Sequence, residues 1–125
     1  AWMLTDEHVA HMNPIAVDKL LAADIGETVI TRSESGKTFR QNRTSLSDEW
    51  EAEGAPNPHK MPYQDVLVGD LLGAIDEHSV APLVHAGAGQ SVGYFDEVVP
   101  VADLMANLLA EADAAIARQM ASRGE

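Results

Sequence analysis

The feature that most constrains this chain is a stripe of apolar residues near its C-terminal end. After Pro100, apolar side chains recur at intervals of three and four residues: Val101, Leu104, Met105, Leu108, Leu109, Ala112 and Ile116. This spacing places them on one face of an α-helix. Pro100 fits the helix start, where a missing N–H and a fixed φ are tolerated. We therefore predict an amphipathic helix followed by a polar tail in residues 100–125, with a face that must meet another surface.

An earlier helix is marked by its first residues. Asn13 can cap the helix and Pro14 suits the first helical position, so the pattern predicts a helix over 13–24, with Gly26 as its C-terminal stop. The run ETVITR that follows is rich in β-branched residues and predicts a short strand over 27–32.

A further helix is expected from about Tyr63 to His78. Its apolar stripe consists of Leu67, Val68, Leu71, Leu72 and Ile75. Two glycines, Gly69 and Gly73, either weaken this helix or mark places where another element packs closely.

Residues 33–62 lack any clear periodicity and are punctuated by glycine and proline. A connection this long inside a compact domain is usually functional, packed on something larger, or disordered. Phe39 and Trp50 argue against full disorder. On these patterns alone, the chain is expected to be mainly α-helical, with one or two short strands.

Composition excludes several classes of partner. The chain of 125 residues has 20 acidic and 8 basic side chains, a formal net charge of −12, which opposes binding to the phosphates of nucleic acid. No apolar run reaches the roughly 20 residues that a membrane-spanning helix needs. There is no cysteine and no leader pattern. We therefore expect a cytoplasmic protein that binds neither nucleic acid nor a membrane.

The segment HAGAGQSVG, residues 85–93, resembles a loop where backbone approaches a ligand. Its glycines are spaced G-x-G-x-x-x-G, which departs from the dinucleotide-binding pattern G-x-G-x-x-G. An ordinary turn is the alternative interpretation. Ser91 also lies in a G-x-S-x-G pattern, as a hydrolase nucleophile does, but no histidine follows it, so a hydrolase triad in the usual chain order is excluded within this chain.

Metal-binding patterns are weak. His8 and His11 lack both the H-E-x-x-H spacing and a third ligand. The acidic residues around Trp50 do not follow a calcium-loop pattern, and a solvated acidic loop explains them better. The other histidines, His59, His78 and His85, stand alone in the sequence. We predict no metal site and no catalytic residue in this chain.

Several stretches, taken in order, resemble the C-terminal part of the nitronate monooxygenase family, flavin-dependent enzymes also called 2-nitropropane dioxygenases. The resemblance extends from about Trp2 to Arg118. It is carried by AWMLTDE, DKLLAADIGETVITRSESGKTFRQNRTSLSDEWE, APNPHKMPYQDVL and GQSVGYFDEVVPVADLMANLLAEADAAIAR. The order of T-V-x-x-R, S-G-K, D-E-W-E, P-x-x-M-P-x-Q and G-Q-S-V-G is more specific than any one of these motifs.

The resemblance implies an α/β fold: a TIM barrel that holds FMN, and a small helical domain formed by C-terminal sequence. The chain would then contain three parts. Residues 1–32 would end the barrel-like region, residues 33–99 would form the small substrate domain with a flavin-facing loop at 85–93, and residues 100–125 would form the C-terminal helix and tail. The remaining barrel sequence, including the turn that binds the FMN phosphate, would lie upstream of Ala1.

By the same resemblance, Gly89, Gln90 and Ser91 are expected to contact the FMN cofactor. The complete protein would oxidise an alkyl nitronate with O₂. The family's catalytic histidine lies in barrel sequence, so the isolated chain is expected to be inactive. Two alternatives remain: an FMN barrel reductase acting on a quinone or an enoyl thioester, and a standalone acidic helical module that binds a partner.

Overall fold

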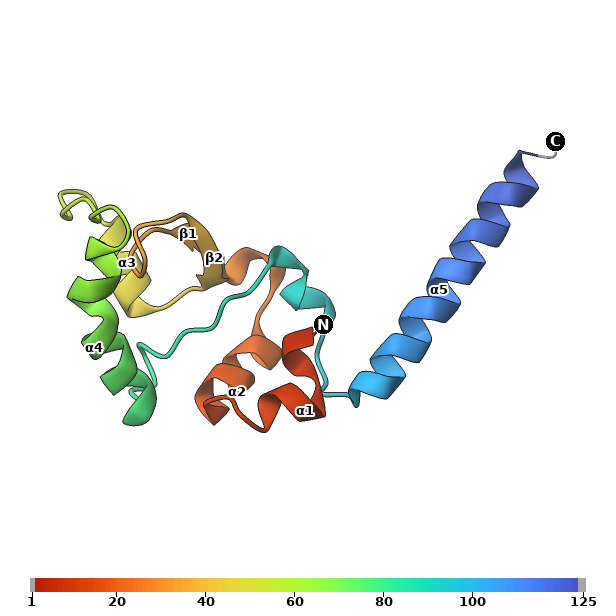
Figure 1. Ribbon diagram of the computed structural model, residues 1–125, viewed down its shortest axis with the longest axis horizontal. Helices are drawn as coiled ribbons and strands as arrows, with labels where there is room; N and C mark the ends of the chain where they lie inside the picture. The colour runs from red at the N-terminus through yellow and green to blue at the C-terminus, as the bar shows by residue number, and fades with distance from the viewer. Residues whose placement is uncertain (1, 124–125) are drawn as a thin grey trace. The chain divides into compact units, whose positions relative to one another are not determined.

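The computed structural model describes residues 2–123, which form two compact units. One unit is residues 12–96, and the other combines the N-terminal segment up to His11 with the segment from Glu97 onward. Helices predominate, and one two-stranded sheet is present among the described residues (Figure 1). Within residues 2–123, none of the helices has the length and apolar character needed to span a bilayer.

The unit of terminal segments contains η1 (Trp2–Leu4), α1 (Asp6–Val9) and α5 (Val101–Ser122). Its two segments are joined by backbone hydrogen bonds, from Asp6 N to Val99 O and from Val99 N to Leu4 O. The Glu7 carboxylate accepts a hydrogen bond of 3.0 Å from Val101 N, which satisfies a free amide at the α5 N-terminus and places negative charge at the positive end of the helix dipole.

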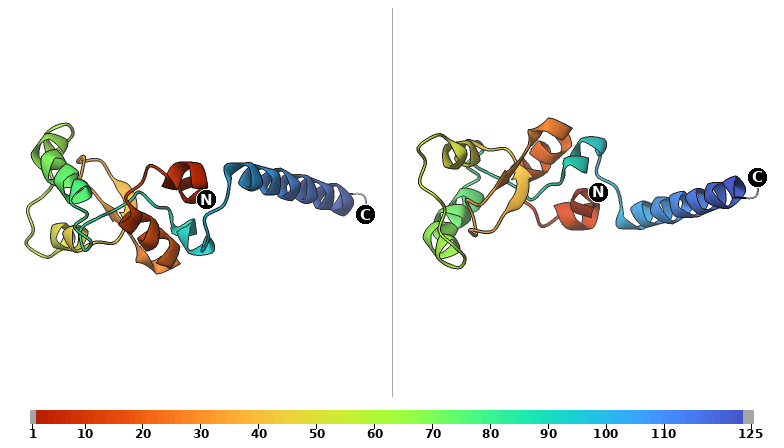
Figure 2. Two further views of the ribbon diagram at one scale, coloured as in Figure 1. Left: turned by 90° about the horizontal axis from the view of Figure 1, so that it is seen from below. Right: turned by 90° about the horizontal axis from the view of Figure 1, so that it is seen from above.

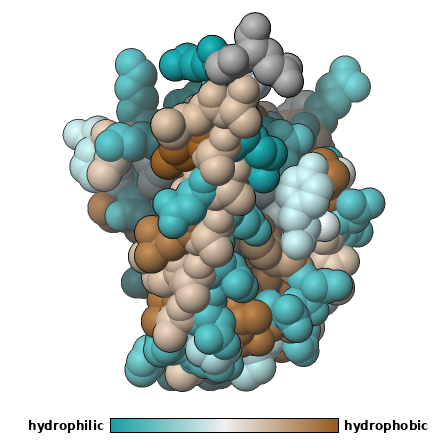
Figure 3. Space-filling model, turned by 90° about the vertical axis from the view of Figure 1, so that its right-hand side faces the viewer, coloured by the Kyte–Doolittle hydropathy of each residue, from teal (hydrophilic) through white to brown (hydrophobic). Residues whose placement is uncertain are grey.

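The predicted C-terminal helix is confirmed as α5, but none of its residues is buried. Leu109 is 61% exposed and Met120 is 71% exposed. Figure 3 shows apolar side chains (brown and tan) along the length of this helix. The apolar stripe is therefore present and uncovered.

In the other unit, α2 (Pro14–Ala22) begins as predicted, because the Asn13 side chain accepts a hydrogen bond from Ile15 N. Its end differs from the expectation. The helix stops at Ala22, and Gly26 lies inside a separate turn, η2 (Ile25–Glu27). Asp24 and Glu27 form a capping box at that turn, so side-chain capping rather than glycine sets the boundary.

Strand β1 (Thr28–Thr31) confirms the predicted strand and pairs antiparallel with β2 (Phe39–Asn42). The hairpin turn contains Gly36 at φ +77°. A side chain at Gly36 would collide with the backbone of the segment around His59 and Met61. The turn is therefore packed directly against this later segment, which only glycine permits.

The prediction of one long irregular connection over residues 33–62 is wrong. That stretch contains β2 and also α3 (Ser45–Glu51), which begins with a capping box between Thr44 and Ser47. Both elements are short and polar, so neither produces the apolar periodicity on which the prediction depended.

Helix α4 (Tyr63–Glu77) confirms the predicted helix and follows a cis peptide bond between Met61 and Pro62. It buries Gln64, Val68 and Ile75. A methyl group added at Gly69 or Gly73 would meet nothing within 4 Å among the described residues, so these glycines do not mark close packing here.

The core of the described residues is small. Nine apolar residues are buried, and three of them are alanines: Leu4, Ala16, Leu20, Val68, Ile75, Val84, Ala86, Ala88 and Val92. Nine polar residues are buried as well: Thr5, Thr28, Thr31, Ser33, Gln41, Asn42, Thr44, Ser47 and Gln64. Thr44, Ser47 and Gln64 are hydrogen-bonded through their side chains, whereas Gln41 Oε1 and Asn42 Nδ2 have no partner among the described residues.

Candidate functional site

The glycine-rich segment before Gly89 is an extended strand laid along β2. Asn42 N donates to Ala86 O and Ala88 N donates to Arg40 O, both at 3.1 Å, and Gln41 forms an antiparallel bridge with Gly87. The Asn42 side chain also accepts a hydrogen bond from Ala86 N. Figure 2 shows this segment passing the hairpin on its way to η3. Residues 86–88 are therefore held by backbone pairing and do not form a free loop.

The three glycines of this segment have different surroundings. A methyl group at Gly93 would lie 2.7 Å from Ile25 N, so η3 (Gln90–Tyr94) packs against η2 and requires glycine there. Gly89 has extended backbone, with φ −78° and ψ 165°, and an added methyl would make only an ordinary contact of 3.7 Å with Ser91 Oγ. Neither backbone conformation nor packing among the described residues demands glycine at 89.

Gln90 and Ser91 begin η3, and both are exposed. Their side chains form no hydrogen bond with another described residue, while Val92 between Ser91 and Gly93 is buried and anchors the turn. Ser91 lacks the strained backbone of a nucleophile elbow, since Ser79 is the non-glycine residue at positive φ among residues 2–123. The turn is anchored by Val92, and the Gln90 amide and the Ser91 hydroxyl are exposed to solvent.

His85 has a partner that the sequence did not reveal. Its Nε2 lies 2.8 Å from Oε1 of Glu34, which comes from the hairpin turn, and both side chains are largely buried. The two atoms are close, but Glu34 Oε1 accepts no hydrogen bond from a described residue, so the pair is a close polar contact. The pair also ties the hairpin to the strand that leads to Gly89. No local pattern could have found it, because 51 positions separate the two residues in the chain.

A buried glutamine joins the hairpin to the start of α4. Gln64 is fully buried; its Nε2 donates to Ser33 O at 2.6 Å and its Oε1 accepts from His59 N at 2.9 Å. This explains the glutamine of the P-x-x-M-P-x-Q motif, since its amide satisfies one donor and one acceptor of two separate loops.

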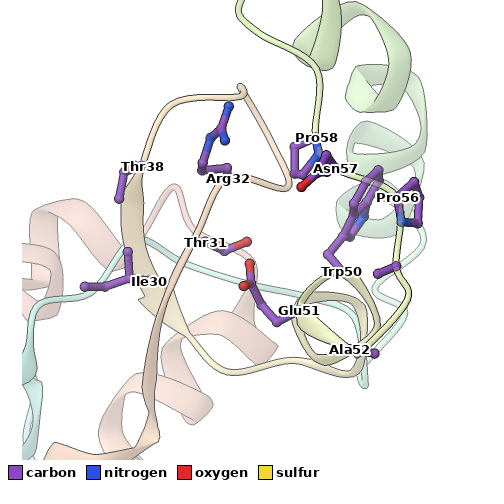
Figure 4. A pocket seen from close by; sticks show the side chains of 11 residues that line it. Ile30, Thr31, Arg32, Thr38, Trp50, Glu51, Ala52, Pro56, Asn57 and Pro58 are labelled. Carbon is purple, nitrogen blue, oxygen red and sulfur yellow. The ribbon is translucent and has the colours of Figure 1, made fainter.

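A cavity of about 480 Å³ opens between the end of β1, the C-terminal part of α3 and the segment 55–58 (Figure 4). Its lining combines the Trp50 ring and two prolines with polar side chains, and consists of Ile30, Thr31, Arg32, Thr38, Trp50, Glu51, Ala52, Ala55, Pro56, Asn57 and Pro58. The volume lies within the usual range for small-molecule sites, roughly 300 to 1,000 Å³. The sequence analysis did not identify this cavity, because its walls come from segments that were interpreted as one irregular connection.

The fold shifts the pKa of Lys19, a residue of α2. Its Nζ donates a hydrogen bond of 2.8 Å to Val84 O, and partial burial lowers the pKa of this ammonium below its usual value. The bond holds α2 against the segment that leads to His85, so the contacts of this lysine give it a structural role.

No group of three or more His, Cys, Asp or Glu side chains capable of holding a metal is present in residues 2–123. Asp48 of the acidic cluster pairs instead with Arg43 at 3.1 Å on the surface.

Comparison with known proteins finds two informative similarities, although no protein-family model matches the chain. The first is to the Mycobacterium tuberculosis protein named "Putative monooxygenase Rv1533", with 34% identity over 116 residues, covering 88% of this chain and 30% of that protein. The second is to the solved structure of FabK from Thermotoga maritima, with a TM-score of 0.64 and 26% identity, covering 94% of this chain and 36% of that one. The chain thus spans about a third of the length of each of these two proteins.

Proposed function

We propose that this chain is the C-terminal part of a longer FMN-dependent oxidoreductase of the nitronate monooxygenase type, whose complete form oxidises alkyl nitronates with O₂. Sequence similarity to a protein named as a monooxygenase supports the reaction class. The match of 94% of this chain to 36% of FabK supports a place within a longer fold. The chain's own motifs supply the resemblance to nitronate monooxygenases.

The observation that carries the proposal is that Gly89, Gln90 and Ser91 are exposed at the start of η3. Backbone pairing with β2 fixes the strand before them, and Val92 is buried after them. Neither backbone conformation nor a tight contact among the described residues requires glycine at position 89. A ligand that approaches this backbone closely would explain the glycine.

The donor set suits a flavin. The Gln90 amide can both donate and accept hydrogen bonds, as the polar edge of a flavin ring requires, and the Ser91 hydroxyl can do the same. Bound FMN would supply the redox chemistry. The residues of this chain would bind and orient the cofactor, while proton abstraction from the substrate would belong to a histidine elsewhere in the complete protein.

We further propose the following division of the chain. Residues 1–32 complete a barrel, residues 33–99 form the substrate domain, and residues 100–125 form a helix whose apolar stripe packs on that barrel. The uncovered stripe of α5 supports this last assignment, because exposed apolar faces of this length normally meet another surface.

An FMN-dependent reductase for a quinone or an enoyl thioester is the second candidate. The structural similarity to FabK supports a shared fold, and one fold hosts many reactions. A small-molecule reductant such as NAD(P)H would then reduce the flavin, which a nitronate oxidase does not need.

The test uses the complete reading frame that contains this chain. We expect the purified protein to bind FMN and to consume O₂ when an alkyl nitronate is added. Replacing Gln90 by alanine should weaken FMN binding about tenfold, the effect of losing one or two hydrogen bonds. Gln119→Ala is the matched control, because Gln119 is an exposed glutamine of α5 and should leave FMN affinity unchanged.

Two results would contradict the proposal. A complete protein without flavin affinity would remove the cofactor assignment and favour a partner-binding module. Flavin that is reduced by NAD(P)H, with no nitronate-dependent O₂ consumption, would establish the reductase in place of the monooxygenase.

A further inference from the structure

We propose that the cavity between β1, α3 and the segment 55–58 binds a small organic carboxylate that carries a flat ring. Every lining residue lies between Ile30 and Pro58. The proposal therefore concerns a site separate from Gly89–Ser91 and does not depend on flavin binding.

The hydrogen-bonding groups of the lining favour an acceptor-rich ligand. Five side chains can donate: Thr31, Arg32, Thr38, Trp50 and Asn57. Glu51 is the one lining side chain that can only accept. Thr31 Oγ1 already accepts from Ser33 N, so its hydroxyl hydrogen is available for another acceptor. A carboxylate offers two oxygens to such a set of donors.

Arg32 supplies the positive charge. Its Nε donates a hydrogen bond of 3.1 Å to Gly36 O, which fixes the guanidinium relative to the hairpin turn. Its terminal amino groups form no hydrogen bond and no ion pair with the residues the structure describes. Such a guanidinium is pre-oriented to bind a carboxylate with two parallel hydrogen bonds. In Figure 4, the Arg32 side chain extends toward the hairpin turn, and Asn57 lies beside Pro58 beyond that turn.

The apolar part of the lining suits a ring. Figure 4 shows the Trp50 indole beside Pro56, below Asn57 and Pro58. An indole and proline rings offer flat surfaces on which an aromatic ring can stack or pack edge to face. A cavity of about 480 Å³ has room for one ring with a carboxylate.

The negative charge of Glu51 opposes the binding of an anion, and this provides a second, independent test of the proposal. Its carboxylate also lines the cavity and has no hydrogen-bond or ion-pair partner among the described residues. Figure 4 shows it pointing toward Thr31, on the opposite side of that residue from the Arg32 guanidinium. Removing its charge should strengthen the binding of an anion and weaken the binding of a cation.

The experiment is a titration of the 125-residue chain with benzoate. The Trp2→Phe background leaves Trp50 as the single tryptophan, and its fluorescence and indole N–H resonance report on the cavity. We expect saturable changes with benzoate and none with benzylamine, which has a similar shape and opposite charge. Arg32→Gln should weaken benzoate binding at least tenfold. Arg43→Gln is the matched control, because Arg43 lies outside the lining and pairs with Asp48 at the surface.

Two further variants keep the test decisive if Arg32→Gln disturbs the hairpin, which near-ultraviolet circular dichroism would detect. Glu51→Gln should tighten benzoate binding about threefold, and Asn57→Asp, at an exposed loop position, should weaken it. Absence of saturation with benzoate, equal binding of benzylamine, or weaker binding in Glu51→Gln would each overturn the proposal. None of these results bears on FMN binding at Gly89–Ser91, so the two proposals fail separately.

Discussion

Helices α4 and α5 carry the same signal in the sequence and have opposite surroundings in the structure. Both have apolar residues spaced by three and four positions. Helix α4 buries Val68, Ile75 and Gln64, whose amide makes two hydrogen bonds, whereas no residue of α5 is buried. Apolar periodicity therefore predicts that a helix has a face to cover, but it does not say which polypeptide or segment covers it.

The comparison extends to the second face of α4. Val66 is 79% exposed and Leu67 is 60% exposed, next to the buried face. This helix thus belongs partly to the core of the 12–96 unit and partly to a surface that resembles α5 in character. Four pairs of substitutions can sharpen or break the contrast, in order of decreasing expected effect.

The largest effect is expected from Ile75→Ala. Ile75 is 3% exposed, so the substitution removes buried methyl groups and leaves a cavity, which should lower the free energy of unfolding by about 3 kcal/mol. The matched change on α5 is Ile116→Ala, at a residue that is 58% exposed. Urea unfolding followed by Trp50 fluorescence in the Trp2→Phe background measures both. Equal losses in the two variants would show that α5 is covered in solution.

Gln64→Ala should cost about 2 kcal/mol, because Ser33 O and His59 N would both lose their partner in a buried setting. Gln119→Ala on α5 should change the free energy of unfolding by less than about 0.5 kcal/mol, as exposed substitutions generally do. The same urea titration applies. A loss in Gln64→Ala no larger than in Gln119→Ala would contradict the bridging role.

Gly73→Ala should raise the free energy of unfolding by up to about 1 kcal/mol, since alanine favours a helix and the added methyl meets open space. Gly93→Ala should lower it, because the methyl would press on Ile25 N. Thermal unfolding by circular dichroism compares the two variants. Destabilisation by Gly73→Ala would mean that this face of α4 is packed against a surface in solution.

The smallest effect on stability is expected from Leu109→Lys on α5. Because Leu109 is largely exposed, the change in the free energy of unfolding should stay within about 0.5 kcal/mol, while binding of a hydrophobic dye falls. Gel filtration and dye fluorescence measure the outcome, with the exposed Ala110→Lys as control. A collapse of the fold in Leu109→Lys would place the stripe inside the core.

The elements that the sequence predicted correctly are those with strong local signals. Asn13 and Pro14 marked the start of α2, Pro100 marked the start of α5, and the β-branched run marked β1. Strand β2 and helix α3 were missed because their stability comes from pairing with β1 and from the Thr44–Ser47 capping box, in sequence too polar to show periodicity.

The candidate sites divide in the same way. The structure places Gly89, Gln90 and Ser91 together at the start of η3, as their adjacency in the chain requires, and their contact with FMN stays a prediction. The His85–Glu34 pair and the cavity beside Trp50 depend on contacts between distant segments. Only the tertiary fold brings such residues together, so no local sequence pattern could predict them.

The strand pairing before Gly89 has a kinetic consequence. The amide hydrogens of Asn42 and Ala88 can exchange with solvent only when residues 86–88 separate from β2, since each is held in a bond between the two segments. The hydrogen-exchange rates of these two amides therefore report how often the whole segment detaches from β2. A molecule that binds at Gln90 only while the segment is attached will lower both exchange rates, even if it contacts neither amide.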